Sequence, residues 1–592
     1  FLNCPALTSL HLPASMSDVN LSLKDPENLT SISIDAANTS YSVVDNVLYN
    51  FAVNRLSTVP PARNTAFTIP DSVEFIDTGA LKNCILLPEI TISTGLISFD
   101  SSELSGCTSL TSIQIATGHS SLISDGTSVT DLTGNTLQLV APGYSGIYTL
   151  PVTVTSLADY ALSDRDKITS FTATQNLTSV GTHAISNCAL LNSITFQGTV
   201  TTLSSSCFRE NPVLQSVQLP SNLTALPASC FRNCTQLTSI SLPASITTID
   251  DYAFDACSSL NTINLEILTD IGRYGFRDCT SLTGLTFGSQ EVTFGSYAFE
   301  NCQNVSSITL PSATNLPKQC FSDIRALESV VLPDNLVTIG DYAFGNCYTL
   351  KSVTFGSNIQ TIGEEAFAYC ALESLVLPEG VQTIEAYAFG ENYSLTYAEL
   401  PSTLTLLGGE SFIECPELIS VVFNGNAPTL DDTTNFDDCH ADLVLYYLKG
   451  ATGFTATLDD IPTAVIDDDL YPAAIWSLEN GFTHNEDFSQ DMNGDGVSLL
   501  EAYAFNLKPS DNLSASLQTA SIVDGKLVLD YYADANLVHY RVETSTDLST
   551  WTPSDITTSL TDTDGMRSSS VSTDDDKRFL RISLTLLTSE NS

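Results

Sequence analysis

Residues 237–257 read LTSISLPASITTIDDYAFDAC, and this spacing of leucine, isoleucine, phenylalanine and cysteine recurs through much of the chain. Phenylalanines return every 22 or 23 residues, at Phe208, Phe231, Phe254, Phe276, Phe299, Phe321, Phe344, Phe367, Phe389 and Phe412. Cysteines often follow three residues later, at Cys234, Cys257, Cys279, Cys302, Cys347, Cys370 and Cys415. A period of this length is typical of solenoids, in which each repeat buries its apolar face by stacking on its neighbours. The sequence therefore predicts a stack of coils and argues against a compact enzyme.

Each repeat is expected to contain two short strands and a helical turn. Residues 237–242 form the first strand, and Pro243 ends it because proline cannot donate a hydrogen bond to a ladder. Residues 246–249 form the second strand, and the helical turn at residues 252–254 carries the phenylalanine. The phenylalanine slot extends upstream as Leu81, Leu104, Leu162 and Ile185. We therefore predict a β-rich solenoid over residues 1–465.

Most of the fifteen cysteines share one slot of the repeat. Others precede the phenylalanine, where different repeats place Ala253, Ala298 or Ala343; these are Cys207, Cys230 and Cys320. Interchange with alanine indicates a small buried side chain, so we expect a ladder of buried thiols. Because Cys230 and Cys234 lie in the same repeat, a disulfide or a metal site there is the alternative.

Two longer repeats, residues 35–70 and 116–150, are predicted to be widened by β-hairpins. The turn residues are Asp45-Asn46 in the first and Asp125-Gly126 in the second. Residues 445–454 leave the pattern, and the segment 440–465 is expected to close the last coil. Beyond them we predict an acidic linker with an EF-hand-like or dockerin-like calcium loop and a helix (residues 466–510), and then a C-terminal β-sandwich-like module (residues 511–592).

The chain is strongly acidic, with 68 Asp and Glu residues against 21 Lys and Arg residues and a net charge of −47. Such a surface repels nucleic acid and anionic membranes. No segment approaches the roughly 18 consecutive apolar residues of a membrane span. The chain opens inside a repeat at Phe1, so we expect the true N-terminus and its secretion signal to be missing. The expected location is extracellular or at the cell surface.

No catalytic motif stands out in the sequence. The six histidines are scattered, at His11, His119, His183, His440, His484 and His539. The zinc-protease, nucleophile-elbow and phosphate-loop patterns do not occur. We therefore expect no enzymatic activity.

One segment has the spacing of a metal-binding loop. Asp491, Asn493 and Asp495 place oxygen ligands at alternate residues around a glycine turn, which suits calcium. The backbone carbonyl of Val497 and the carboxylate of Glu501 would complete the set, although Glu501 stands one residue early for an EF-hand loop. We predict a structural calcium ion here, and a solvated acidic turn is the alternative.

The outward positions of the first strands form a hydroxyl-rich and nearly uncharged stripe. They are Ser239, Ser241, Thr262, Asn264, Ser307, Thr309, Ser352 and Thr354, followed by Ser420 and Val422. Neighbouring strands lie about 4.8 Å apart, so these side chains would form ladders. Such ladders can hydrogen-bond a protein or polysaccharide ligand, but serine and threonine also suit a strand that faces only water.

The repeat, together with the insertion YSVVDNVLY at residues 41–49, resembles the BspA-type leucine-rich repeats of bacterial surface proteins. This resemblance covers most of the chain and implies a leucine-rich-repeat solenoid that adheres to a host or matrix. The repeat lacks the asparagine ladder of commoner leucine-rich repeats. A looser similarity, in DMNGDGVSLLEAYAFNLKP (residues 491–509) and YRVETSTDLSTW (residues 540–551), links the C-terminal part to secreted proteins of Verrucomicrobia-type bacteria.

The favoured function is a secreted or cell-surface, non-enzymatic binding or adhesion protein. Its extended repeat surface would meet a protein or polysaccharide. One alternative is a structural rod of the cell envelope without a specific ligand. Another is an accessory region of a polysaccharide-active protein whose catalytic part lies outside this sequence.

Overall fold

The structure is a computed structural model. It describes residues 4, 6–17, 27–99, 101–198, 200–466, 471–482, 490 and 497–504, and six strands between residues 521 and 586. Two compact units, Phe1–Leu350 and Lys351–Ser592, are described separately. In the described part of the chain, no helix is both long and apolar enough to cross a membrane.

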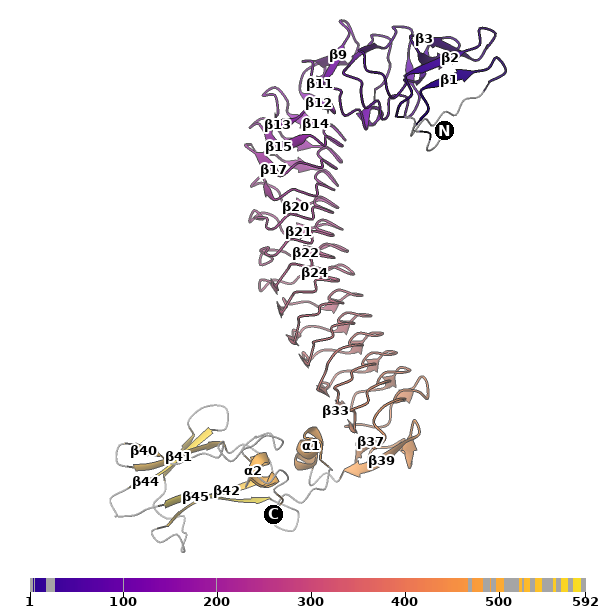
Figure 1. Ribbon diagram of the computed structural model, residues 1–592. Helices are drawn as coiled ribbons and strands as arrows, with labels where there is room; N and C mark the ends of the chain where they lie inside the picture. The colour runs from indigo at the N-terminus through magenta and orange to yellow at the C-terminus, as the bar shows by residue number, and fades with distance from the viewer. Residues whose placement is uncertain are drawn as a thin grey trace. The chain divides into compact units, whose positions relative to one another are not determined.

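Coils of the first unit contribute longer strands and short strands, which form separate sheets along the stack (Figure 1). The longer strands are β1 (Ser9–Leu12), β2 (Ser31–Ile34), β6 (Phe67–Thr68), β8 (Glu89–Ile92), β9 (Ser112–Ile115), β13 (Gly146–Thr149), β15 (Ile168–Ala173), β17 (Ser193–Phe196), β19 (Ser216–Gln218), β23 (Gly284–Thr286), β25 (Ser307–Thr309) and β27 (Ser329–Val331). The short strands are β7 (Phe75–Ile76), β14 (Ser156–Leu157), β16 (Ser179–Val180), β18 (Thr202–Leu203), β20 (Ala225–Leu226), β21 (Thr248–Ile249), β22 (Asp270–Ile271), β24 (Thr293–Phe294), β26 (Asn315–Leu316) and β28 (Thr338–Ile339). A 3-10 helix, η1, spans Ser101–Leu104.

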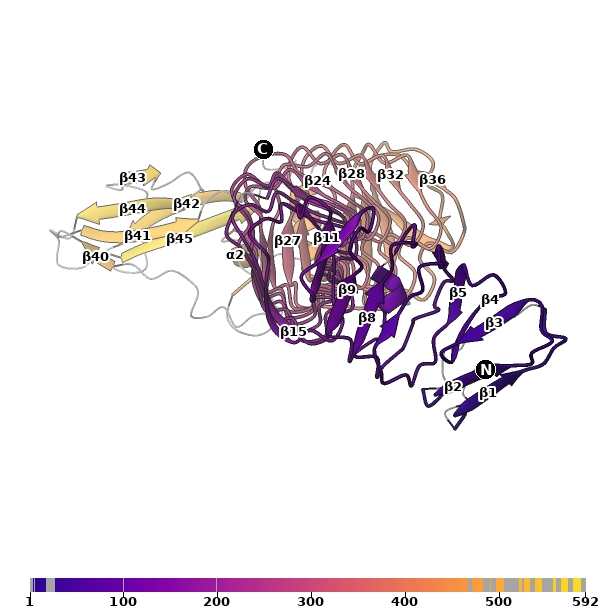
Figure 2. The ribbon, with the colours of Figure 1, turned by 90° about the horizontal axis from the view of Figure 1, so that it is seen from above.

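The register of these sheets keeps equivalent residues opposite one another. Phe171 of β15 lies opposite Ile194 of β17, which lies opposite Val217 of β19, in parallel pairing. Seen from above, regular coils of this unit overlie one another (Figure 2). The predicted solenoid is therefore confirmed, with like residues stacked on like.

Both predicted hairpins are present. β3 (Tyr41–Val44) pairs antiparallel with β4 (Val47–Asn50), and the turn residues Asp45 and Asn46 have φ of 51° and 62°. Positive φ at both central residues is what a type I′ hairpin turn requires. The second hairpin joins β10 (Leu122–Ser124) to β11 (Ser128–Asp131). In each case a third strand, β5 (Arg55–Thr58) or β12 (Thr136–Val140), pairs with the hairpin and then with the next short strand.

The turn that carries the phenylalanine is not helical, which corrects the prediction. Tyr252 and Ala256 both have φ of 60°, in the left-handed region. The amides of Tyr252, Phe254 and Ala256 donate to carbonyls of the next coil, at Arg273, Gly275 and Arg277. In a helix these amides would donate to carbonyls of the same helix, whereas in this solenoid they form the hydrogen bonds between one coil and the next.

The phenylalanines form a buried, stacked spine. Phe276, Phe299 and Phe321 are fully buried, and their ring centroids are separated by 5.1 and 5.6 Å with planes 4° and 5° from parallel. Offset stacking at this distance is favourable beyond the burial of apolar area. The spine thus supplies the apolar contact between coils that the period predicted.

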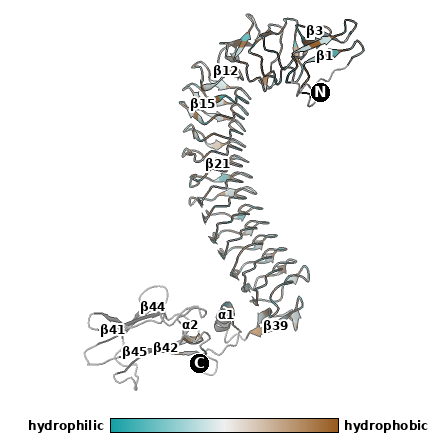
Figure 3. Ribbon diagram, viewed as in Figure 1, coloured by the Kyte–Doolittle hydropathy of each residue, from teal (hydrophilic) through white to brown (hydrophobic). Residues whose placement is uncertain are grey.

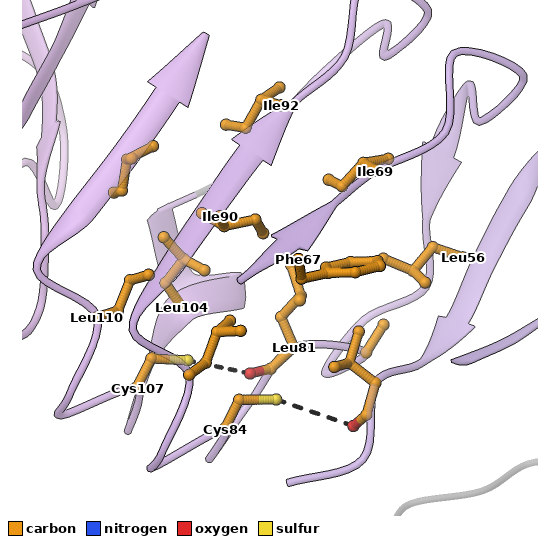
Figure 4. Close-up of a cluster of buried hydrophobic side chains, with 14 of the residues drawn as sticks. Leu56, Phe67, Ile69, Leu81, Cys84, Ile90, Ile92, Leu104, Cys107 and Leu110 are labelled. Carbon is orange, nitrogen blue, oxygen red and sulfur yellow. Dashed lines mark hydrogen bonds between the residues drawn. The ribbon is translucent and has the colours of Figure 1, made fainter. Parts of the chain in front are cut away.

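The cysteine slot holds a thiol that bonds to the preceding coil. Cys234 Sγ lies 3.2 Å from the carbonyl oxygen of Phe208, and Cys107 Sγ lies 3.1 Å from that of Leu81 (Figure 4). Asn211 fills the same slot in one coil, and its Nδ2 donates to the Ile185 carbonyl at 2.8 Å. The slot therefore needs a small buried donor, which a thiol or an amide can supply.

None of the fifteen cysteines is in a disulfide, so the predicted thiol ladder is confirmed over the disulfide alternative. Burial raises the pKa of the Cys234 thiol to about 12, which keeps it protonated and able to donate. Cys230 Sγ lies 3.5 Å from Cys207 Sγ in the neighbouring coil, not bonded to Cys234 of its own repeat.

The second unit continues the same kind of coil. Its longer strands are β29 (Ser352–Thr354), β31 (Ser374–Val376), β33 (Tyr397–Leu400), β35 (Ser420–Phe423), β37 (Val444–Leu448) and β39 (Ile461–Ile466). Its short strands are β30 (Thr361–Ile362), β32 (Thr383–Ile384), β34 (Leu406–Leu407), β36 (Thr429–Leu430) and β38 (Thr457–Leu458). Phe436 stacks on Phe412 at 5.6 Å, and β37 pairs in register with β35. Residues 445–448 thus continue the repeat, contrary to the expectation that they leave it.

Beyond the coils, the described residues of the second unit form two helices and six strands. The helices are α1 (Tyr471–Glu479) and α2 (Leu499–Ala504). One antiparallel sheet contains β40 (Ser521–Val523), β41 (Lys526–Tyr532), β44 (Met566–Ser572) and β43 (Thr557–Leu560). A second pairs β42 (Val538–Ser545) with β45 (Phe579–Leu586). These strands lie within residues 511–592, where the C-terminal β module was predicted.

Candidate binding surface

The predicted hydroxyl stripe is exposed in the first unit. Ser307 and Thr309 of β25 are exposed, while Ile308 between them is 8% exposed. Ser239, Ser241, Thr262 and Asn264 of other coils are exposed as well. Alternation along a strand sends successive side chains to opposite faces, so the isoleucine enters the core and the hydroxyls face outward. Teal and brown segments both occur within the coils, as this alternation requires (Figure 3).

The hydroxyls of this stripe are free of internal bonds. In the described part of the first unit, Ser241, Thr262, Ser307 and Thr309 make no side-chain hydrogen bond. In an earlier coil, by contrast, Ser193 Oγ donates to Ser170 Oγ at 3.0 Å. Asn264 Oδ1 accepts from the amide of Glu266 at 2.9 Å and is partly engaged. The free hydroxyls are available to water or to a polar ligand.

In the second unit, Ser352 and Thr354 of β29 are exposed as predicted. The six exposed residues of the first unit, which we call the open strand face, are Ser239, Ser241, Thr262, Asn264, Ser307 and Thr309. Ser307 and Thr309 lie on β25, whereas Ser239 and Thr262 form an isolated parallel bridge, so the strand predicted at residues 237–242 is reduced to that bridge.

Ser420 and Val422 were expected to face outward, and this expectation is wrong. Ser420 is 1% exposed and Val422 is fully buried. Val422 belongs to a buried cluster with Tyr446 and with Ile475 and Leu478 of α1. Helix α1 therefore packs over this part of the strand face. The residue pattern of the strands alone does not predict that a helix covers them.

An aromatic ladder runs along the turn edge of the first unit and was not predicted. Tyr252, Tyr274 and Tyr297 occupy one slot of successive coils and stack at 4.7 and 4.6 Å between centroids. Arg277 lies over the Tyr274 ring at 4.7 Å. The recurrence of tyrosine two residues before the phenylalanine is a signal in the sequence that could have identified this ladder.

A buried carboxylate forms ion pairs between coils along this edge. Asp255 is 1% exposed and lies 2.8 Å from Arg232 Nε and 2.8 Å from Arg277 Nε. These contacts join three consecutive coils, because each of the three residues belongs to a different repeat. A buried charge persists only when it is paired, so the two arginines explain why an aspartate is tolerated there.

The predicted calcium loop lies largely outside the described residues, which exclude Asp491, Asn493 and Asp495. Val497 is 6% exposed and packs with Ala502 of α2 and Trp476 of α1. Glu501 lies within α2. The calcium ion therefore stays a prediction. Within the described residues, no group of three His, Cys, Asp or Glu side chains could hold a metal ion.

Comparison with known proteins identifies the repeat. The model of the BspA type leucine rich repeat region matches residues 62–132, 147–261, 224–322 and 314–441. Together these segments span more than half of the 592 residues. No curated protein matches the chain.

Several solved structures are similar. A leucine-rich repeat protein of Bacteroides ovatus is 20% identical with a TM-score of 0.49, over 69% of this chain and 98% of that one. A leucine rich cell surface protein of Faecalibacterium prausnitzii is 23% identical with a TM-score of 0.37, over 52% and 97%. The repeat geometry and the extent of the family match lead to one assignment: the chain belongs to the BspA-type leucine-rich repeat proteins.

Proposed function

We propose that this protein is a cell-surface or secreted binding protein without catalytic activity, whose open strand face meets an extended protein or polysaccharide. The observation that supports this is the contrast within one structural slot. Where α1 covers the strand face, the slot holds Tyr397, Val422 and Tyr446. Where the described face is exposed, its outward positions hold the hydroxyls of Ser307, Thr309, Ser352 and Thr354, together with the valines Val331 and Val376. An open, uncharged and polar face on a chain of charge −47 suits a ligand rich in hydroxyl or amide groups.

The surface location is supported by the family and by the described cell-surface protein of Faecalibacterium prausnitzii. The hydroxyls and the amide offer both donors and acceptors, so neither ligand class requires a charged partner. The affinity of each single site would be small, and many stacked coils would add to it by multivalency.

The test is saturable binding of the full chain to purified matrix proteins and soluble polysaccharides, with calcium and with a chelator. In the Thr309→Glu variant, a carboxylate placed in the open strand face should weaken binding about tenfold, because the charge must be desolvated in the complex. The matched control is Thr293→Glu, which adds the same charge to exposed Thr293 of β24 in the other sheet.

Equal losses in the two variants would show that charge and not the strand face controls binding. Absence of any saturable ligand would favour the structural rod. If ligand binding requires calcium, the Asp495→Asn variant should bind no better with calcium than with the chelator. That result would support the predicted loop and its structural role.

A further inference from the structure

The second widened coil contains a cavity. The hairpin strands β10 and β11 are added to the short-strand sheet, and β12 pairs with β14. Ser98 and Phe99 of the preceding coil are not in a strand. A cavity of about 580 Å³ opens between them and residues 138–160. This volume lies within the range of small-ligand sites, roughly 300–1,000 Å³.

A β-bulge places a polar side chain in this cavity. Leu139 is opposite Val129 and Leu137 is opposite Thr130, so Gln138 is the extra residue of β12. Bulges redirect side chains and are frequent beside functional sites. Gln138 is half-buried, lines the cavity and makes no side-chain hydrogen bond within the described residues.

The first widened coil provides an internal comparison. Its bulge residue is Ser57, because Leu48 pairs with Thr58 and Tyr49 with Leu56. Ser57 Oγ donates to Asp77 Oδ2 at 2.8 Å, so its polar group is already engaged. The two insertions share a strand order and a bulge. The unengaged amide of Gln138 is therefore not a general consequence of the insertion.

The rest of the lining combines aromatic rings with hydrogen-bonding groups. Phe99 packs partly against the buried cluster of the first unit, and Leu139 supplies an apolar wall. Tyr160 is 44% exposed and stacks on His183 at 5.1 Å with planes 4° apart, which holds its ring in place. Among the polar groups, Asp159 Oδ1 accepts from the amide of Thr182 at 2.7 Å.

We propose that this cavity binds a neutral sugar residue. A sugar ring has C–H faces that pack on aromatic rings and a rim of hydroxyls that both donate and accept. Phe99 and Tyr160 supply the rings, while Gln138 and Asp159 supply an amide and a fixed carboxylate. No lysine or arginine lines the cavity, and a carboxylate does, so phosphates and uronic acids are excluded by charge. A lysine side chain would suit the carboxylate but would leave the Gln138 donors unpaired. This site is separate from the open strand face.

The test is ligand-observed NMR titration of the full chain with methyl glycosides of glucose, galactose, mannose and N-acetylglucosamine. Glucuronic acid and N-acetyl-lysine methylamide serve as the charged probes. At least one neutral glycoside should saturate, and both charged probes should bind more weakly. The same sugar displayed on a polymer distinguishes a glycan chain end from a free sugar, since only a chain-end site gains affinity from display.

Four variants test the named groups. Phe99→Leu keeps the apolar packing but removes the ring, Asp159→Asn keeps the acceptor for Thr182, and Gln138→Leu removes the amide. Each should weaken neutral-sugar binding about tenfold, equivalent to about 1.4 kcal/mol. Tyr160→Leu should do the same, and its matched control is Tyr274→Leu, which changes the same repeat slot in a coil without the cavity. Equal urea midpoints would show that the variants remain folded.

The proposal is overturned if no neutral glycoside saturates, if the lysine or uronate probe binds more tightly, or if Phe99→Leu and Tyr160→Leu bind as the wild type does. Thr309→Glu separates this site from the open strand face, because it should leave glycoside binding unchanged. If the wild-type chain binds a matrix protein or polysaccharide but no glycoside, the proposal for the cavity is refuted and the proposed function is not.

Discussion

The strand face of β25 and that of β35 use the same structural slot in opposite ways. In β25 of the first unit, Ser307 and Thr309 are exposed. In β35 of the second unit, Ser420 and Val422 are buried, and Val422 lies in a cluster with residues of α1. The backbone alternation is identical, so the fold does not dictate what the slot contains. Val422 packs with α1, whereas the exposed outward positions hold the hydroxyls of β25 and also valines, at Val331 and Val376.

The largest effect in this comparison should come from the shared spine beneath both faces. Phe299→Ala removes a fully buried ring from between Phe276 and Phe321. We expect a loss of about 3–5 kcal/mol in the free energy of unfolding, from the lost apolar contact and the cavity left behind. Urea unfolding followed by circular dichroism measures it. A loss below about 1 kcal/mol would mean that neighbouring coils collapse into the gap.

The cover of the strand face should depend on a few α1 side chains. Leu478→Ala truncates a residue that is 2% exposed in the cluster with Val422 and Tyr446. We expect α1 docking to weaken by about 2–4 kcal/mol, seen as faster hydrogen exchange of the α1 amides. Val376→Ala is the matched control, since Val376 lies on an outward position and is 50% exposed. Similar exchange in both variants would contradict the role of α1 as a cover.

Docking of α1 should also respond to pH. Burial raises the pKa of Glu479, and the negative charge of Glu399 raises it further. Tyr397 and Asn424 donate to Glu399 at 3.0 and 2.7 Å, which keeps that carboxylate in place. A carboxyl whose pKa is higher when docked binds protons on docking. Docking should therefore strengthen as pH falls from 7 through the raised pKa towards the ordinary value near 4.5.

Fluorescence of Trp476 measures this dependence, in a Trp551→Phe background because the chain has two tryptophans. Glu479→Gln should make the signal less dependent on pH while α1 stays docked. An unchanged profile in Glu479→Gln would assign the dependence to another group.

The smallest effect should come from the open hydroxyls. The double substitution Ser307→Ala and Thr309→Ala removes side chains that make no hydrogen bond within the described part of their unit. We expect a change within about 0.5 kcal/mol in the free energy of unfolding, as for surface sites without partners. The urea titration used for Phe299→Ala provides the measurement. A loss above about 1 kcal/mol would show that the hydroxyls stabilise the coil and are not free for a ligand.

The outcome for the cysteines shows how far the repeat could be interpreted from its pattern. Exchange of Cys with Ala at one slot predicted buried thiols without disulfides, and none of the fifteen cysteines is in a disulfide. The pattern did not predict that Cys234 bonds to the Phe208 carbonyl, because that requires the distance between coils. The turn at Tyr252 was predicted to be helical because its short spacing suits a helix as well as a left-handed turn.

The candidate sites divide in the same way. The exposure of Ser307 and Thr309 follows from alternation, which any strand of this sequence obeys. Burial of Val422 under Leu478 joins residues 56 positions apart that belong to different patterns. The bulge at Gln138 depends on how β11 and β12 pair, which their composition does not specify.

The amino-acid sequence by itself determined the repeating part of this protein: the period, the short strand that recurs along the stack, the phenylalanine spine and the side chains that face outward. Tertiary structure alone decided which part of that outward face α1 covers, how each turn bonds to the next coil and where a cavity opens. The physical reason is that burial repeated in every coil leaves a periodic trace in the residues. A contact made once, between segments of different pattern, leaves none.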